Sequence, residues 1–311
     1  MATVVIITKG ENLQFFGRYD KSVCLFKHLR ENIDSNSKGA TSRGLFPNVF
    51  NLAATSVITV NATCGETGPE VYCKLVEHVF RNENDRESQD QCGTCDARSP
   101  SPDKKHPIEN AIDGTNRWWQ SPTLQNGKQY QWVTITLDLK QVYQIAYVIV
   151  KSAISPRPGN WILERSLDGI IYKPWQYYAL SDNECWEVYG IRPTIGQPHY
   201  RMDDEVICTS YYSKLNPLEN GEIHTSLVNG RPGVDGPSSK LMDFTKARYV
   251  RLRLQKIQTL HADLMSLQIG GEHIDPSVSR RHFYSIKDIS VVANVLVLVM
   301  QIHVSTDLKY R

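Results

Sequence analysis

Cys92 and Cys95, separated by two residues, form the sequence element with the plainest capacity for chemistry. This spacing suits half of a zinc site or a redox pair. A zinc site needs a second tight pair of ligands, and Cys64 with Cys73 is too widely spaced to supply one. A redox pair needs a thioredoxin-like βαβ context, which the surrounding sequence lacks. Structural disulfides are therefore the better interpretation, and these four cysteines permit three pairings that sequence alone does not rank.

Cys185 and Cys208 remain as a natural third pair, and they enclose a proline-containing loop. Closing a loop of that size contributes roughly 3 kcal/mol in the chain-entropy account. An even set of cysteines in one region is typical of an oxidising compartment. Asn61 begins an Asn-Ala-Thr glycosylation sequon just before the first of them, which also favours secretion. Cys24 lies apart from the set and has no expected partner.

Asp113 and Thr115, in an Asp-Gly-Thr-Asn turn, form the candidate cation site. Calcium prefers carboxylate, hydroxyl and carbonyl oxygens that converge on one loop, and these two residues carry such oxygens. The alternative is an aspartate that bonds to its own backbone in a turn. We weigh the two interpretations about equally.

Patterns typical of catalysis do not occur in the sequence. The run Asp203-Asp204-Glu205 places its carboxylates next to one another, whereas glycoside hydrolysis needs two that face each other. The nine histidines show no His-Glu-x-x-His spacing, and no nucleophile elbow, P-loop or dinucleotide fingerprint is present. We expect a non-enzymatic protein, in which the tryptophans anchor the core and the loops: Trp118, Trp119, Trp132, Trp161, Trp175 and Trp186.

The net charge of +2 gives no concentrated basic face of the kind that binds nucleic acid. Locally, Arg248, Arg251 and Arg253 lie in an alternating segment flanked by Lys246 and Lys256. Such a row could offer a surface to a sulphated glycan or an anionic lipid. More often it is the solvated face of a strand.

The ends of the chain differ in character from its body. Residues 1–42 are polar, hold no apolar stretch of signal-peptide length, and are expected to form an atypical, disordered extension. Residues 43–291 form the expected domain. Residues 292–311 form an atypical tail, and the apolar run at 291–300 is about half the length that spans a bilayer, so no transmembrane segment is predicted.

Short β-type segments separated by Gly, Pro and Asn turns predict a sandwich or jelly roll. The expected strands are 132–139, 142–151, 161–166, 172–178, 248–254 and 283–289. Segment 142–151 is the most continuously apolar and fits burial on both faces. A helix is expected around 70–79, where Val71, Leu75, Val76 and Val79 fall at helical spacing.

Several motifs resemble known families. Residues 111–121 (Ala-Ile-Asp-Gly-Thr-Asn-Arg-Trp-Trp-Gln-Ser), 132–139, 163–169 and 247–252 resemble the discoidin β-sandwich. More specific are Arg-Gly-Leu-Phe-Pro at 43–47, Asn-Ala-Thr-Cys-Gly-Glu at 61–66, Tyr-Cys-Lys-Leu-Val-Glu-His at 72–78, Pro-Arg-Pro-Gly-Asn-Trp at 156–161 and Pro-Leu-Glu-Asn-Gly-Glu at 217–222. These resemble the laminin amino-terminal domain of α1/α2-type chains, over about residues 43–291.

The resemblance implies a secreted, discoidin-like, all-β-dominated sandwich with short helices and disulfide-stapled loops, located in basement membrane. It also implies association with the amino-terminal domains of laminin β and γ chains in a network node, and calcium near the Asp113 turn. Heparan sulphate, sulphatide and an integrin are further partners that it suggests. The family's polymerisation motif carries over to Pro217, Leu218, Glu219, Asn220, Gly221 and Glu222.

Two functional interpretations follow, and they predict different mutational effects. In a network node, changing Glu219 and Glu222 abolishes association with partner domains and leaves heparin retention intact, because their carboxylates contact a partner's cations or amides. In a discoidin-like module for glycans or anionic lipids, those changes do nothing, and neutralising Arg251 and Arg253 removes binding. A solvated turn at 217–222 is the structural alternative.

Overall fold

The computed structural model describes residues 51–75, 92–258 and 279–293, except 197, 199, 235 and 237. Residues 52–291 form one compact unit. Some sequence predictions fall outside the described residues. These are the extension at 1–42 with Cys24, the Arg-Gly-Leu-Phe-Pro motif, and all but the first two residues of the predicted tail.

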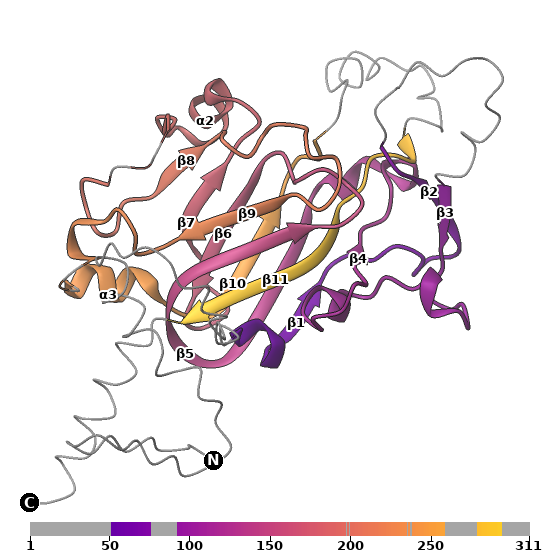
Figure 1. Ribbon diagram of the computed structural model, residues 1–311, viewed down its shortest axis with the longest axis horizontal. Helices are drawn as coiled ribbons and strands as arrows, with labels where there is room; N and C mark the ends of the chain where they lie inside the picture. The colour runs from indigo at the N-terminus through magenta and orange to yellow at the C-terminus, as the bar shows by residue number, and fades with distance from the viewer. Residues whose placement is uncertain are drawn as a thin grey trace, which may run out of the picture. The chain divides into compact units, whose positions relative to one another are not determined.

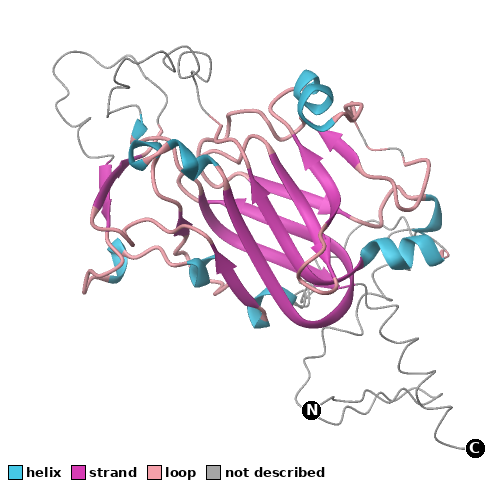
Figure 2. Ribbon diagram, turned by 180° about the vertical axis from the view of Figure 1, so that it is seen from behind, coloured by secondary structure: helices cyan, strands magenta, loops and turns pink. Residues whose placement is uncertain are grey.

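Strands dominate the described residues, and the helices among them are short (Figure 2). The strands are β1 (Val57–Val60), β2 (Glu70–Cys73), β3 (Cys92–Cys95), β4 (Trp119–Gln120), β5 (Val133–Ser152), β6 (Trp161–Ser166), β7 (Lys173–Tyr178), β8 (Ile207–Thr209), β9 (Glu222–Ser226), β10 (Lys246–Leu254) and β11 (Ser285–Ala293). The α-helices are α2 (Asp182–Tyr189) and α3 (Ser239–Thr245). The 3-10 turns are η2 (Leu52–Thr55), η4 (Pro102–Lys104), η5 (Ile108–Ala111), η6 (Leu124–Asn126), η7 (Lys128–Gln131) and η8 (Pro232–Val234).

The long strand β5 belongs to both layers of a β-sandwich (Figure 1). Its first half pairs with β1 and β10, in a layer that continues through β6, β7 and β8. Its second half pairs with β9 and neighbours β11, which in turn pairs with β4. Between the halves the chain bends at Lys140, whose φ of 70° is stabilised by an Asp138 carboxylate that accepts the Lys140 N–H at 2.7 Å.

The core of the sandwich follows from strand alternation. Val250, Leu252 and Leu254 of β10 lie opposite Leu137, Ile135 and Val133 of β5, and all six side chains are fully buried. Because alternate strand residues point to opposite faces, Arg251 and Arg253 take the outer face of the same layer. Beneath the layer, Trp161 stacks on Tyr178 with ring centroids 4.0 Å apart. The burial pattern therefore fixes which side chains are left for the surface.

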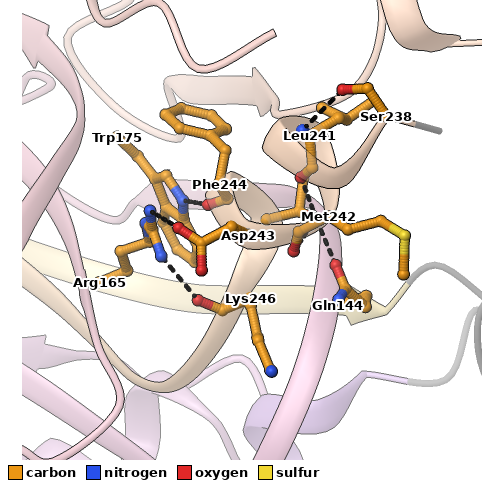
Figure 3. A network of polar contacts seen from close by, with 10 residues as sticks. Gln144, Arg165, Trp175, Ser238, Leu241, Met242, Asp243, Phe244 and Lys246 are labelled. Atoms are coloured by element: carbon orange, nitrogen blue, oxygen red, sulfur yellow. Dashed lines mark hydrogen bonds and ion pairs between the residues drawn. The ribbon is translucent and has the colours of Figure 1, made fainter.

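Helix α3 is tied to the strands by polar contacts (Figure 3). The Ser238 hydroxyl caps its first turn by accepting the Leu241 N–H at 3.1 Å. Its last turn is bonded to β7, because Trp175 Nε1 donates to the Phe244 carbonyl at 2.6 Å. Arg165, on β6, donates to the Lys246 carbonyl at 3.2 Å and pairs with Asp243 at 3.6 Å. These bonds fix α3 at the start of β10.

Several sequence expectations need correction. The helix expected at 70–79 is wrong for its first turn, since Glu70–Cys73 form strand β2, paired with β3 and joined to it by a disulfide; residues 76–79 lie outside the described residues. Segments 132–139 and 142–151 are parts of one strand. Segment 142–151 is not buried on both faces, because it alternates, with Val148 and Val150 buried and Ile149 and Lys151 partly exposed.

No helix in the described residues is long and apolar enough to cross a membrane.

Candidate interaction surface

The loop at Pro217–Glu222 connects β8 to β9 and is fixed at both ends. The Asn216–Pro217 peptide bond is cis, and Asn220 has a φ of 56°, a conformation that asparagine tolerates better than most residues. The Asn220 N–H donates to the Ala153 carbonyl at 2.7 Å, and the Gly221 carbonyl accepts from the Ser152 N–H at 2.8 Å. The loop therefore extends the pairing between β5 and β9 and has a defined shape.

Arg157 clamps this loop from the Pro-Arg-Pro-Gly-Asn-Trp segment. Its Nη2 donates to the carbonyls of Lys214 at 3.0 Å and Asn216 at 2.8 Å. The aliphatic part of the side chain crosses Gly221 so closely that a Cβ there would lie 2.8 Å from Arg157 Cγ. A side chain at 221 would therefore displace Arg157 from the loop. The sequence marked both segments as family motifs but gave no sign that one holds the other.

The two carboxylates of the loop are accessible, yet each already has a lysine partner. Glu219 pairs with Lys74 at 3.4 Å, and both side chains are 38% exposed. Glu222 accepts from Lys151 Nζ at 2.6 Å and lies 3.1 Å from His224 Nε2. The Lys151 hydrogen bond, helped by His224, holds the pKa of Glu222 below its usual range. Both carboxylates are therefore available as oriented acceptors.

A cavity of about 380 Å³ borders Glu222 and reaches the Asp-Gly-Thr-Asn turn. Its walls come from β5, β9, β11 and that turn, so the structure brings Glu222 and Thr115, two predicted site residues, to one place. Sequence reasoning missed its remaining walls, which carry no local motif: Gly114, Asn116, Ile149, Lys151, His224, Lys287, Asp288 and Ser290.

Asp113 forms the backbone-bonded turn that is the alternative to a calcium site. Its Oδ1 accepts the Thr115 N–H at 2.8 Å, and its Oδ2 accepts from Arg117 Nη2 at 2.9 Å. Partial burial acts to raise the pKa of Asp113, but the bonds from Thr115 and Arg117 outweigh it and lower the pKa. Thr115 Oγ1 also accepts from Arg117. As arranged, a guanidinium fills the place that a cation would take, so the turn does not fit calcium without moving Arg117.

The three arginines of the predicted anion patch are paired with two carboxylates, so most of their charge is offset within the fold. Arg251 and Arg253 share one carboxylate, Glu164, at 2.6 and 3.0 Å. Glu164 is only 4% exposed, and Arg251 is further covered by the Tyr172 ring at 3.4 Å. Arg248 makes two hydrogen bonds to Asp138, each 3.0 Å, which lower the pKa of that aspartate. The row is thus a set of ion pairs on a strand face.

The structure forms three disulfides. Cys64 pairs with Cys95, and Cys73 with Cys92, which selects one of the three pairings that the sequence left open. Cys185–Cys208 is the third and joins α2 to β8. In the described residues, the only group of three side chains able to hold a metal is Cys64, Cys95 and Glu70, and both of its cysteines are oxidised.

The remaining predicted positions are placed as follows. Asn61 is exposed at the end of β1. Trp119, Trp161 and Trp175 are fully buried, whereas Trp132 and Trp186 are 58% and 61% exposed. The tryptophans therefore divide between core and surface.

Comparison with known proteins assigns the family. The profile of the laminin N-terminal domain (domain VI) matches residues 45–293. Human laminin subunit alpha-1 is 63% identical over 254 residues, human laminin subunit alpha-3 is 45% identical over 272 residues, and the laminin subunit alpha of Drosophila melanogaster is 44% identical over 253 residues. These matches cover 80%, 81% and 79% of this chain, which spans 8%, 8% and 7% of the relatives' own lengths.

Solved structures give weaker matches. The family 32 carbohydrate-binding module of Clostridium perfringens NanJ, in complex with galactose, is 10% identical with a TM-score of 0.33, over 78% of this chain and 96% of that one. Chitosan-binding module 1 of a Paenibacillus chitosanase/glucanase is 12% identical with a TM-score of 0.36, over 78% and 98%. The chain belongs to the laminin N-terminal (domain VI) family, and is a non-catalytic, extracellular structural domain of the laminin α-chain type found in basement membrane.

Proposed function

We propose that this domain joins a laminin network by presenting the 217–222 loop to the amino-terminal domains of β and γ chains. The observation that carries the proposal is a rigid acidic loop: Glu219 and Glu222 have side chains 38% and 42% exposed, on a backbone fixed by Arg157. A loop already in its bound shape loses little conformational entropy on association. Directional carboxylates on such a loop suit a partner's arginine, lysine or backbone amides.

The lysine partners of the two carboxylates do not block this role. Ion pairs between exposed side chains contribute about 0–1 kcal/mol, so Lys74 and Lys151 are displaced at small cost. An arginine of the partner forms a stronger ion pair with the carboxylate than the lysine that it displaces, because its guanidinium binds the carboxylate through two parallel hydrogen bonds. Until then the lysines orient the two carboxylates. The cavity beside Glu222 offers room for a side chain of the partner.

Analytical sedimentation with β- and γ-type amino-terminal domains tests the proposal. We expect a ternary species with the wild-type chain and none with E219Q/E222Q. The matched control is E109Q/E187Q, which removes the same charge from two exposed positions in η5 and α2. Loss of association in the control as well, or unchanged association of E219Q/E222Q, contradicts the proposal.

A glycan- or anionic-lipid-binding function is the other candidate from sequence, and the structure offers it less support. Its main cations, Arg251 and Arg253, both pair with the buried Glu164, which offsets one of their two charges. Heparin retention of a second variant, R251Q/R253Q, discriminates between the two: the glycan function predicts that this variant loses retention, whereas the node proposal predicts that it still forms the ternary species. Heparan sulphate, sulphatide and integrin stay predictions from the family resemblance, and so does calcium, which has no part in the contacts proposed above.

A further inference from the structure

Asn61 and Trp132 meet at the edge where β1 joins β5. The Asn61 N–H donates to the Thr134 carbonyl at 3.3 Å, and Asn61 Oδ1 accepts the Thr134 N–H at 2.9 Å. Asn61 Nδ2 points along β5 and donates to the Trp132 carbonyl at 3.4 Å. The side-chain amide is therefore held flat against β5, with its nitrogen directed at Trp132.

Trp132 comes directly before β5, and its backbone carbonyl is the atom that this amide contacts. Val133 is fully buried, so its neighbours Trp132 and Thr134 take the outer face of the layer. Asn61 lies opposite Thr134, which makes Trp132 its diagonal neighbour, within reach of a large aromatic ring. Trp132 is 58% exposed, whereas three other tryptophans are fully buried. The residues that the structure describes therefore leave more than half of this side chain uncovered.

Asn61 is the one Asn-X-Ser/Thr sequon of the chain, so its Nδ2 is the atom to which a glycan attaches. We propose that Trp132 is a stacking platform for the innermost N-acetylglucosamine of a glycan on Asn61. Glycosylation replaces the Nδ2 hydrogen cis to Oδ1, so the bond to the Trp132 carbonyl is given up and the amide shifts to let the sugar project beside Trp132. The sugar then leaves the amide beside the indole, whose apolar face it covers. A sugar ring presents C–H groups to the aromatic face, and burying both removes apolar surface from water.

This inference is independent of the partner loop at 217–222, and the failure of either proposal leaves the other standing.

A double-mutant cycle on the full chain, directed to the secretory pathway by a cleavable leader, tests the platform. Thermal unfolding is compared for wild type, W132A, N61Q and N61Q/W132A made in cells that keep glycans high-mannose. We expect W132A to lower Tm by about 2–4 °C more in the glycosylated background than in the N61Q background. Endoglycosidase trimming to a single N-acetylglucosamine should preserve that difference. W186A, which alters a tryptophan of similar exposure on α2, serves as control and should shift Tm equally in both backgrounds.

Two outcomes overturn the proposal. One is an intact mass that does not change on deglycosylation, since Asn61 then carries no glycan. The other is an equal effect of W132A with and without the glycan. Enzymatic removal of the whole glycan from folded wild type and W132A gives the same comparison if N61Q does not fold.

Discussion

His106 should make this domain lose stability in mild acid. The residue is 4% exposed, stacks on Trp118 with ring centroids 4.6 Å apart and meets Tyr72 edge-on. Its Nε2 is buried without a hydrogen-bond partner in the described residues. Burial lowers the pKa of His106 from its ordinary 6.5 to about 4, and a bond to the Trp118 backbone offsets this only in part. The buried imidazole is therefore neutral at physiological pH.

The sign and size of the effect follow from linkage. Because the folded pKa is the lower one, the unfolded chain binds the proton more tightly. Stability is intact above pH 6.5 and falls as the pH drops toward the folded pKa. The loss amounts to about 2 kcal/mol at pH 5 and about 3 kcal/mol at pH 4. Carboxylates add their own pH dependence, so the contribution of His106 has to be isolated by a variant.

H106F removes the titration and keeps a flat ring between Trp118 and Tyr72. Urea unfolding of both proteins at pH 7.5, 6, 5 and 4.5 gives the difference in unfolding free energy. We expect that difference to move in favour of H106F by about 2 kcal/mol between pH 7.5 and pH 5. A difference constant to within ~0.5 kcal/mol over this range refutes the reasoning, because the error of extrapolation is no larger.

Three further predictions concern the interaction surface. G221A should force Arg157 off the loop, so partner association should weaken at least about tenfold while Tm falls by only about 2–4 °C. Sedimentation and thermal unfolding measure the two effects, and association as strong as that of the wild type refutes the prediction. E164Q removes the buried carboxylate that two arginines share, so it should lower the free energy of unfolding in urea by about 2 kcal/mol and raise the salt concentration needed for elution from heparin. Unchanged elution would contradict the argument that Glu164 offsets the charge of these arginines. Calcium should leave the Tm of the wild type unchanged but raise that of R117Q, in which Asp113 is freed; a calcium-dependent Tm in the wild type shows instead that the guanidinium is easily displaced.

Sequence reasoning predicted the architecture because alternation and turn residues are local signals. Arg251 and Arg253 sit at alternate positions between apolar residues, and the structure places them on the outer face as that pattern indicates. It could not predict that segments 132–139 and 142–151 are one bent strand, because the bend at Lys140 depends on a left-handed residue that is neither glycine nor asparagine. The helix expected from Val71 and Leu75 failed because pairing with β3 overrode a short periodic signal.

The candidate site was less predictable than the fold. The acidic loop was found through its motif, but its clamp, Arg157, lies 64 residues before Gly221 in the chain, and only tertiary contact reveals the pairing. Likewise, the charge of a row of arginines says nothing about a carboxylate such as Glu164, which arrives from another strand. Long-range partners of this kind carry no periodicity for a sequence to display.

The position of β11 determines when the sheet can be completed during synthesis of the chain. The strand is the last of those that the structure describes, yet it inserts between β4 and β5, where Ile286 lies opposite Trp119. A sheet whose interior strand is synthesised last stays open throughout translation of the preceding residues, with the apolar faces on either side of the gap uncovered. Contacts this distant in sequence also form slowly. A nascent chain that stops short of residue 285 should therefore be held by chaperones in the secretory pathway, while completion of β11 should release it.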